Sequence, residues 1–365
     1  MITIAYDHQF FSMFRYSGIT RYFYELISRL VDEPDVSLSL YMGFHINDFD
    51  YARFKSRYAH FFGFRRPGIP KTTRIFNTLN DFLCPFFIKR AGPALYHQTY
   101  YRSYVPGFKG KRVLTVYDMT YELFPDKFSK DDPAILEKQG SIRQADAIIA
   151  ISESTKKDII RLLSIAPEKI TVAYLANSLT AHPAGLPPAG GPFILYVGQR
   201  CPHKNFAVLL NAYCRSSRLN REYGLVCFGG DPFTEEEKQH LAHHGLLGRA
   251  RQVCGNDELL AGYYSRASLL VYPSLYEGFG LPLLEAMHFG CPVVASRVPS
   301  LTEIGGQAGF YFDPNSPDDL TAAMERVFSD TSVRKQMIDR GHCREKEFSW
   351  DACASQTLAL YKSLL

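Results

Sequence analysis

Short apolar runs that alternate with amphipathic helical patterns predict an α/β protein of two Rossmann-like domains, each with a doubly wound parallel sheet. The chain has 365 residues, and a typical domain has ~150, so two domains are expected. A proline- and glycine-rich stretch at 177–192 separates two similar βα series. We expect the two halves to face a cleft at the carboxyl ends of their strands.

The first series of elements defines an N-terminal domain over residues 1–176. Ile2–Tyr6 is an apolar run rich in β-branched residues, and helical periodicity follows in Ile19–Leu30. Ser152 stands where an N-cap is expected for a helix over Thr155–Leu163. Further strands are expected at Val36–Tyr41, Ala94–Tyr96, Arg112–Val116 and Ala147–Ile151.

The second series follows the 177–192 linker directly and defines a domain over 193–345. Strands are expected at Phe193–Gly198, Gly224–Phe228, Arg251–Val253, Leu269–Tyr272 and Pro292–Ala295. Helices are expected at Asn205–Tyr213, Glu258–Ala267, Pro282–Phe289 and Leu320–Phe328. A last helical segment, within 346–365, is expected to pack back on the N-terminal domain.

Composition restricts the class of protein. The hydrophobic fraction of 46% and the charged fraction of 21% are typical of globular domains, and a formal charge of +4 does not indicate a nucleic-acid partner. The eight cysteines lack a CxxC pair, so buried reduced thiols are expected rather than a disulfide frame or a metal site. Neither a signal-peptide pattern nor an apolar run near the ~18 residues that span a bilayer is present. We therefore expect a cytoplasmic protein, at most peripheral on the cytoplasmic face of the membrane.

The most informative motif is YPSLYEGFGLPLLEAMHFGCPVVAS at residues 272–296. Pro282 suits the first position of a helix that Gly290 and Pro292 would end. The unpaired amides of the first helical turn and the helix dipole form a site suited to phosphate. Glycines in the preceding turn let the backbone approach a ligand closely.

Two glutamates, Glu277 and Glu285, bracket this turn. Carboxylates repel phosphate, but they accept hydrogen bonds from sugar or ribose hydroxyls. The helix dipole alone also favours acidic residues near a helix N-terminus, so each glutamate taken by itself fits a structural role equally well.

The segment resembles the E-x7-E signature of the family 4 retaining glycosyltransferases (group 1, GT-B fold), which include glycogen synthases, sucrose synthases and bacterial mannosyltransferases. The resemblance covers most of the chain and is strongest over 192–330. It implies that Glu277 contacts the donor sugar and that Glu285 contacts the ribose hydroxyls. The other donor-binding residues that it implies in this domain are Gly198, Ser274, Gly278, Phe279, Gly280 and Leu281.

A basic motif, VGQRCPHKN at 197–205, carries Arg200 and Lys204. Two basic residues in a loop are commonly surface residues, but their position resembles the family's arginine–lysine pair. Fixed cations there would stabilise the charge that develops on a departing nucleoside diphosphate. His203 is expected to be solvated, and neither a metal nor another cofactor is expected.

In the first domain, YSGITRY at 16–22 lacks G-x-G-x-x-G, which counts against a dinucleotide dehydrogenase. By resemblance, Gly18 lets the backbone approach the donor phosphate and the acceptor, while Arg21 faces either the cleft or the helix surface. Tyr117 occupies a position where many relatives have a histidine near the donor sugar. Asp118 is a candidate catalytic contact in the cleft, with a strand-end structural role as the alternative.

Two further patterns lie in the first domain. Asp48-Phe49-Asp50 is a DxD, the metal-binding pattern of a different glycosyltransferase fold, but no other ligands are grouped with it. Residues 49–90 carry nine Lys/Arg against two aspartates, interleaved with aromatic residues. This segment suits core packing with a solvated face, single-stranded nucleic acid, or an anionic inner-membrane surface or lipid-diphosphate acceptor. Family resemblance favours the lipid, and no nucleic-acid partner is expected.

These patterns lead to one hypothesis. A hexose moves from a nucleotide diphosphate sugar to a hydroxyl of a glycan or lipid-diphosphate-linked acceptor, with retained anomeric configuration. Tyr-Glu-Leu-Phe-Pro at 121–125 resembles bacterial surface-polysaccharide mannosyltransferases, which favours mannose and GDP-mannose and a role in polysaccharide or lipopolysaccharide synthesis. The alternatives are a sugar-nucleotide epimerase or phosphorylase of the same fold, or a non-catalytic sugar-nucleotide-binding subunit.

Overall fold

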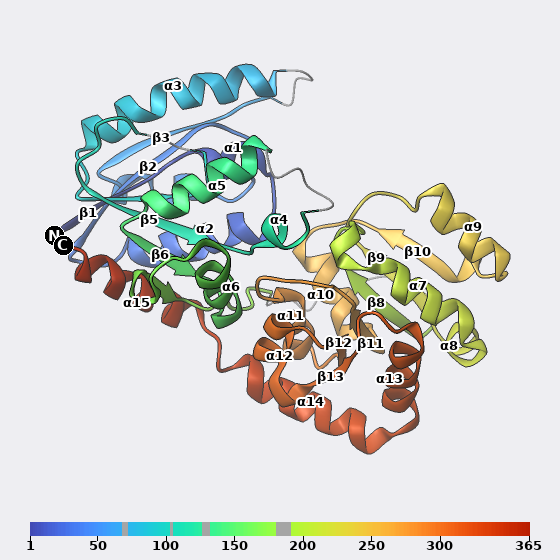
Figure 1. The fold of residues 1–365 in the computed structure, drawn as a ribbon. Coiled ribbons are helices and arrows are strands. Elements are labelled where there is room, and N and C mark those ends of the chain that lie inside the picture. The colour runs from blue at the N-terminus through green and yellow to red at the C-terminus, as the bar shows by residue number, and fades with distance from the viewer. Residues whose placement is uncertain (68–71, 103–104, 126–131, 180–190) are drawn as a thin grey trace. The chain divides into compact units, whose positions relative to one another are not determined.

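The computed structural model describes residues 1–67, 72–102, 105–125, 132–179 and 191–365 (Figure 1). The chain divides into two compact units, unit 1 with Met1–Leu175 and Ser349–Leu365, and unit 2 with Ala176–Phe348. Most of the predicted linker at 177–192 lies outside the described residues.

Unit 1 contains a parallel sheet of seven strands in the order β3-β2-β1-β4-β5-β6-β7. The order reverses at β1, which pairs with β2 on one side and with β4 on the other. Right-handed crossovers that run in opposite directions from such a point cover opposite faces of the sheet, which gives a doubly wound fold. The strands are β1 (Ile2–Tyr6), β2 (Val36–His45), β3 (His60–Arg65), β4 (Leu95–Gln98), β5 (Lys111–Val116), β6 (Ala147–Ala150) and β7 (Ile170–Val172).

Several helices of unit 1 begin at a residue whose side chain accepts a hydrogen bond from the first turn. Ser17 and Thr20 form a capping box at the start of α2, and the Ser152 hydroxyl accepts from the Thr155 amide at 2.9 Å, so the predicted N-cap is confirmed. The helices are α1 (Gln9–Met13), α2 (Gly18–Leu30), α3 (Thr73–Ala91), α4 (Thr120–Leu123), α5 (Pro133–Gln144), α6 (Glu153–Leu163) and α15 (Trp350–Ser363), with 3₁₀ turns η1 (Tyr51–Arg57) and η2 (Pro167–Lys169).

Unit 2 repeats the same plan with six parallel strands in the order β10-β9-β8-β11-β12-β13. The order reverses at β8, so the prediction of two doubly wound parallel sheets is confirmed. The strands are β8 (Phe193–Val197), β9 (Gly224–Phe228), β10 (Ala250–Val253), β11 (Leu269–Tyr272), β12 (Val293–Ser296) and β13 (Gly309–Phe312).

Several helices of unit 2 bury apolar side chains such as Leu209, Leu241 and Met324 in one core with the strands. The helices are α7 (Phe206–Arg215), α8 (Ser217–Glu222), α9 (Glu235–His243), α10 (Asp257–Arg266), α11 (Leu281–His288), α12 (Pro299–Gly305), α13 (Pro317–Ser329) and α14 (Thr331–Glu345), with 3₁₀ turns η3 (Pro202–Lys204), η4 (Leu247–Arg249) and η5 (Gly306–Ala308).

The basic and aromatic segment 49–90 forms three elements, η1, the edge strand β3 and the helix α3. Strand β3, with the sequence HFFGFR, was missed because it is an edge strand without a buried apolar run. Helix α3 lies along the outer side of β2 (Figure 1).

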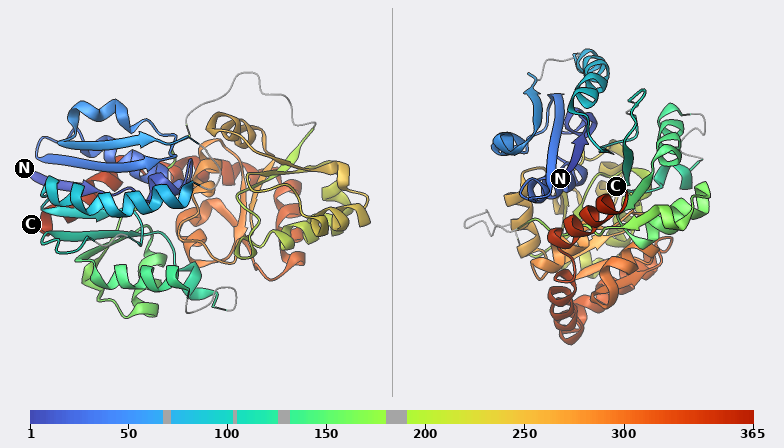
Figure 2. Two further views of the ribbon diagram at one scale, coloured as in Figure 1. Left: turned by 90° about the horizontal axis from the view of Figure 1, so that it is seen from above. Right: turned by 90° about the vertical axis from the view of Figure 1, so that its left-hand side faces the viewer.

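Helix α15, the last helix of the chain, belongs to unit 1. Both chain ends lie at one end of this unit (Figures 1 and 2). Tyr361 of α15 shares a 3.1 Å hydrogen bond with Tyr6 of β1 and also hydrogen bonds His97 of β4. The second ring nitrogen of His97 lies 2.9 Å from the Thr115 hydroxyl. A buried polar network therefore joins the last helix to three strands of the sheet.

We predict that unit 1 loses stability on mild acidification because of His97. Complete burial lowers the pKa of His97 to about 3, whereas the unfolded chain binds a proton near pH 6.5. Protons therefore favour the unfolded state between these values, by ~1.4 kcal/mol per pH unit once pH is well below 6.5. Urea unfolding followed by fluorescence of Trp350, the sole tryptophan of the sequence, measures this effect.

The stability deficit of His97→Gln relative to the wild type should shrink as the pH is lowered from 7 to 5, because the variant has no proton to bind. The exposed His243→Gln is the matched control and should leave the slope of the wild type unchanged. A His97→Gln deficit that stays constant with pH would contradict the assignment.

Candidate functional site

The switch point of unit 2 brings two loops together at one edge of the sheet. Because β8 and β11 are adjacent and parallel, the loops that follow them begin side by side. The Leu275 amide donates to the His203 carbonyl at 2.8 Å and ties the loops to each other. This geometry places Lys204, from η3, against Glu277, from the loop after β11.

Lys204 and Glu277 form a close ion pair. The Lys204 Nζ donates to Oε1 and Oε2 of Glu277 at 2.6 and 2.8 Å, and Ser274 donates its hydroxyl to Oε1 at 2.5 Å. The side chains are 21% and 11% exposed. Burial opposes the charge on Lys204, but the Glu277 carboxylate outweighs it, so the pKa of Lys204 is raised. The site thus holds a fixed cation whose present partner an incoming anion can replace.

Helix α11 starts directly after this pair. Its N-cap is Gly280, with a φ of +105°, and an added Cβ there would lie 2.6 Å from Cδ2 of Leu301. A side chain at this position is therefore excluded by both backbone conformation and packing. Pro282 occupies the second helical position, one later than expected. The first turn of α11 lies at the same strand edge as Lys204. Pro282 has no amide hydrogen, and the Leu283 amide donates to the Gly280 carbonyl at 2.9 Å, so the Leu281 amide is the first that this turn can offer a ligand.

The second glutamate of the motif, Glu285, is buried in α11 at its fifth position rather than the expected fourth. It accepts a 2.8 Å hydrogen bond from the Tyr264 hydroxyl of α10. This contact between α10 and α11 is a structural role for the carboxylate. A contact with ribose stays a prediction.

Arg200, the other basic residue of the motif, pairs with a different carboxylate from Lys204. Its Nε donates to the two Glu237 oxygens of α9 at 2.9 and 3.2 Å, and Nη2 donates to the Asp231 and Pro232 carbonyls. The guanidinium also lies over the Phe233 ring, 4.9 Å from its centroid. Glu237 was missed in the sequence because it lies 37 residues from Arg200.

Part of the Arg200 side chain is still unpaired. Its Nη1 is buried without a hydrogen-bond partner among the described residues. The Glu237 carboxylate competes for the guanidinium, so a phosphate would have to displace that carboxylate to use Arg200 fully.

Glycines shape the neighbouring loops after β8 and β9. Gly198, a predicted donor-binding residue, has a φ of +129°, and Gly230 has a φ of +70°. A Cβ on Gly230 would lie 3.3 Å from the Gly198 carbonyl oxygen. A side chain at Gly230 would therefore be both crowded and strained, whereas at Gly198 only the backbone conformation disfavours one, because nothing lies within 4 Å of an added Cβ there. Gly278 and Phe279, in the loop before α11, are buried.

In unit 1, the switch point holds a buried carboxylate that the sequence analysis missed. Asp7, directly after β1, is fully buried and accepts from the Gln9 amide at 3.1 Å, from the Tyr96 hydroxyl at 2.6 Å and from the Thr99 amide at 3.3 Å. It thereby fixes the ends of β1 and β4. The signal available in the sequence was an aspartate placed directly after the apolar run at 2–6.

The residues of unit 1 that were predicted to contact the donor or acceptor have defined positions or contacts within the unit. Gly18 is the exposed first residue of α2, and Arg21 is buried rather than on the helix surface. Tyr117 packs against Phe10 and is buried, with no hydrogen-bond partner for its hydroxyl in the described parts of the chain. Asp118 accepts from the Thr120 amide at 2.9 Å, which is the strand-end role given above as its alternative. Their roles toward a donor stay predictions.

The DxD motif has structural partners. Asp48 forms ion pairs with Arg15 and Arg65, and Asp50 caps η1 through the Arg53 amide. Within the described ranges, neither aspartate belongs to a group of residues that could hold a metal ion.

The cysteines are free thiols, as expected, but not all of them are buried. Cys254 and Cys343 are exposed, and Cys201 is half-buried. Also, none of the helices in the described ranges is long and apolar enough to cross a membrane.

Two family models match the chain. Residues 16–176 match the model described as Glycosyltransferase Family 4, and residues 179–343 match Glycosyl transferases group 1. O-antigen chain mannosyltransferase B of Escherichia coli is 34% identical over 276 residues, which cover 72% of this chain and 72% of that protein.

Solved structures show the same fold. Sucrose-phosphate synthase from Thermosynechococcus elongatus aligns with a TM-score of 0.78 at 21% identity, covering 100% of this chain and 99% of that chain. HepE of Anabaena, solved in complex with UDP and glucose, aligns with a TM-score of 0.71 at 18% identity, covering 100% of both chains.

Two glycine substitutions test the backbone of the site. Gly280→Ala should destabilise the protein by about 1–3 kcal/mol, because alanine is strained at positive φ and its methyl group meets Leu301. Gly18→Ala is the control, since nothing lies within 4 Å of an added Cβ there, and it should change stability by less than about 0.5 kcal/mol. Circular dichroism during urea denaturation measures both, and equal effects would refute the packing argument.

Proposed function

Because the chain belongs to the group 1 glycosyltransferases and has their GT-B fold, we propose that it transfers a hexose from a nucleotide diphosphate sugar to an acceptor hydroxyl with retained configuration. The observation that carries the proposal is the Lys204–Glu277 pair at the strand edge where α11 begins. In this proposal unit 2 binds the donor and unit 1 supplies contacts to the acceptor.

Mannose is the favoured sugar and GDP-mannose the favoured donor. The support comes from the Escherichia coli relative, which is named as an O-antigen chain mannosyltransferase, together with residues 121–125 of this chain. The proposed acceptor is a glycan or a lipid-diphosphate-linked glycan in surface-polysaccharide synthesis.

The site residues have separate tasks in the proposed reaction. The donor diphosphate binds the Leu281 amide at the start of α11 and the Lys204 ammonium, which exchanges the Glu277 carboxylate for phosphate. Glu277 is then free to accept a hydrogen bond from a hydroxyl of the donor sugar. As the bond from C1 to the phosphate oxygen breaks, negative charge grows on the leaving group, and Lys204 stabilises it more in the transition state than in the ground state.

The proposed mechanism retains configuration through attack on the same face. The acceptor oxygen forms its bond to C1 on the side from which the diphosphate departs, and a leaving phosphate oxygen takes the acceptor proton. Lys204, the Leu281 amide and Arg200, once it leaves Glu237, neutralise the diphosphate. We therefore propose that this chemistry needs no metal ion.

Substitutions of the ion pair test the proposal. Lys204→Ala should lower kcat by roughly 10²-fold or more, by analogy with the loss of one preorganised electrostatic donor. Glu277→Gln should also lower turnover, because the amide accepts the sugar hydroxyl less strongly than the carboxylate. Release of GDP from GDP-mannose is measured with a glycan acceptor and EDTA, and NMR of the product gives the anomeric configuration.

Lys238→Ala is the matched control, because Lys238 is an exposed lysine of α9 that pairs with Glu235 within the same helix. It should keep wild-type turnover. If Lys204→Ala also turns over at the wild-type rate, the proposed role of Lys204 is wrong. A strict phosphate requirement or an epimerised donor would instead favour the phosphorylase or epimerase alternatives.

We also propose that unit 1 contacts an anionic membrane surface through α3. One face of this helix exposes Ile75, Leu79, Phe82 and Phe86 at helical spacing, with Phe82 64% and Phe86 61% exposed. The opposite face buries Asn80, Cys84 and Ile88, while Arg74, Lys89 and Arg90 lie near the helix ends. An apolar stripe with basic ends suits the interface of a membrane that contains anionic lipids.

Replacing both Phe82 and Phe86 with Ser should weaken co-sedimentation with phosphatidylglycerol vesicles by about a hundredfold or more, because each buried phenylalanine contributes about 1.5–3 kcal/mol. Leu136→Ser, on the exposed side of α5, is the control. Vesicle binding that is equal in the two variants would exclude α3 as the contact.

A further inference from the structure

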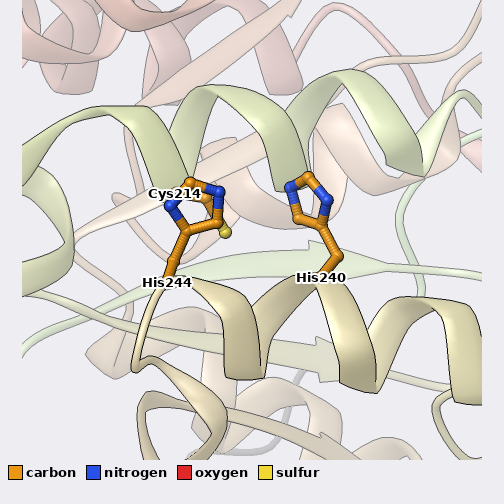
Figure 3. A group of neighbouring side chains, drawn as sticks. All are labelled: Cys214, His240 and His244. Atoms are coloured by element: carbon orange, nitrogen blue, oxygen red, sulfur yellow. The ribbon is translucent and has the colours of Figure 1, made fainter.

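Outside the site described above, a cysteine and two histidines gather between two helices of unit 2. Cys214 lies in the last turn of α7, while His240 and His244 lie one turn apart at the end of α9. Figure 3 shows both imidazole rings rising from the same side of α9 toward α7, with the Cys214 sulfur beside them. One ligand atom from each of the three side chains lies within 4.8 Å of the other two.

This set of atoms matches the ligands of a tetrahedral metal site. Zinc binds imidazole nitrogen at about 2.0–2.1 Å and thiolate sulfur at about 2.3 Å, so ligand atoms in such a site are roughly 3.3–3.7 Å apart. Small side-chain rotations bring three atoms that lie within 4.8 Å to these separations. Three protein ligands leave a fourth position for water.

Two properties of the side chains favour a metal. The Nε2 of His240 is buried and has no hydrogen-bond partner among the described residues. Burial first, and then the nearby His244, His243 and Arg215, lower the pKa of His240. A buried nitrogen without a partner is costly unless something binds it.

Cys214 and His244 supply the other two ligand atoms. Cys214 is 4% exposed, and burial raises its pKa to about 11, so a metal ion would have to displace the thiol proton. His244 is exposed and gives an ion access from solvent. Soft sulfur with imidazole nitrogen selects zinc and related transition metals over magnesium or calcium.

We propose that Cys214, His240 and His244 form a structural transition-metal site, with Zn²⁺ as its natural ion, that joins α7 to α9. The same helix α9 carries Glu237, whose carboxylate holds Arg200. A metal at this site would fix α9 against α7 and thereby position Glu237. The ion takes no part in the proposed transfer reaction, so the site stands whether or not the proposed function does.

The test is a Co²⁺ titration of tag-free, reduced, chelator-treated full-length protein. We expect one equivalent to bind with a thiolate-to-cobalt charge-transfer band and the visible bands of tetrahedral cobalt. One equivalent of Zn²⁺ should remove these bands and raise the thermal unfolding midpoint. Cys214→Ser should abolish the charge-transfer band, and His240→Ala and His244→Ala should each lower cobalt affinity by about tenfold or more.

His243→Ala is the matched control, because His243 is exposed on the same helical turn but lies outside the group. It should bind cobalt like the wild type. His244→Ala keeps the test valid if Cys214→Ser or His240→Ala fails to fold, since His244 is exposed. The proposal is overturned if the wild type shows no charge-transfer band, or if His243→Ala loses as much affinity as His244→Ala.

Discussion

The ion pair between Lys204 and Glu277 is the interaction on which the account of this chain depends. Two loops meet at the switch point of unit 2, and each contributes one charge to the pair. The carboxylate keeps the half-buried ammonium charged, and Gly280 starts α11 at the same strand edge. A cation and a helix N-terminus at one strand edge are the features of an anion site, and we propose that the donor diphosphate replaces the carboxylate there.

Unit 1 uses buried polar groups for a different purpose. Asp7 gathers donors from the ends of β1 and β4, and His97 links β4 and β5 to α15. Buried polar networks of this kind are stable only when their members are satisfied, so they specify one arrangement of the strand ends. The proposed reaction uses other residues than these.

Much of the fold and part of the site could be predicted from the sequence. Most strands follow from local apolar periodicity, although β3, β7 and β13 were not predicted, and the roles of Gly280 and Ser152 follow from residue type and position. The Arg200–Glu237 pair, the Asp7 network and the Cys214–His240–His244 group could not be predicted, because each joins residues far apart in the chain. Arg200 and Lys204 pair with different carboxylates in the structure, and their joint contact with a diphosphate stays a prediction.

A crystal structure of the protein with a bound nucleoside diphosphate tests the central claim most directly. The account predicts that the Lys204 Nζ leaves Glu277 and lies about 3 Å from a phosphate oxygen that also accepts from the Leu281 amide at the start of α11. A nucleotide bound elsewhere, with the Lys204–Glu277 pair still closed, would contradict the account.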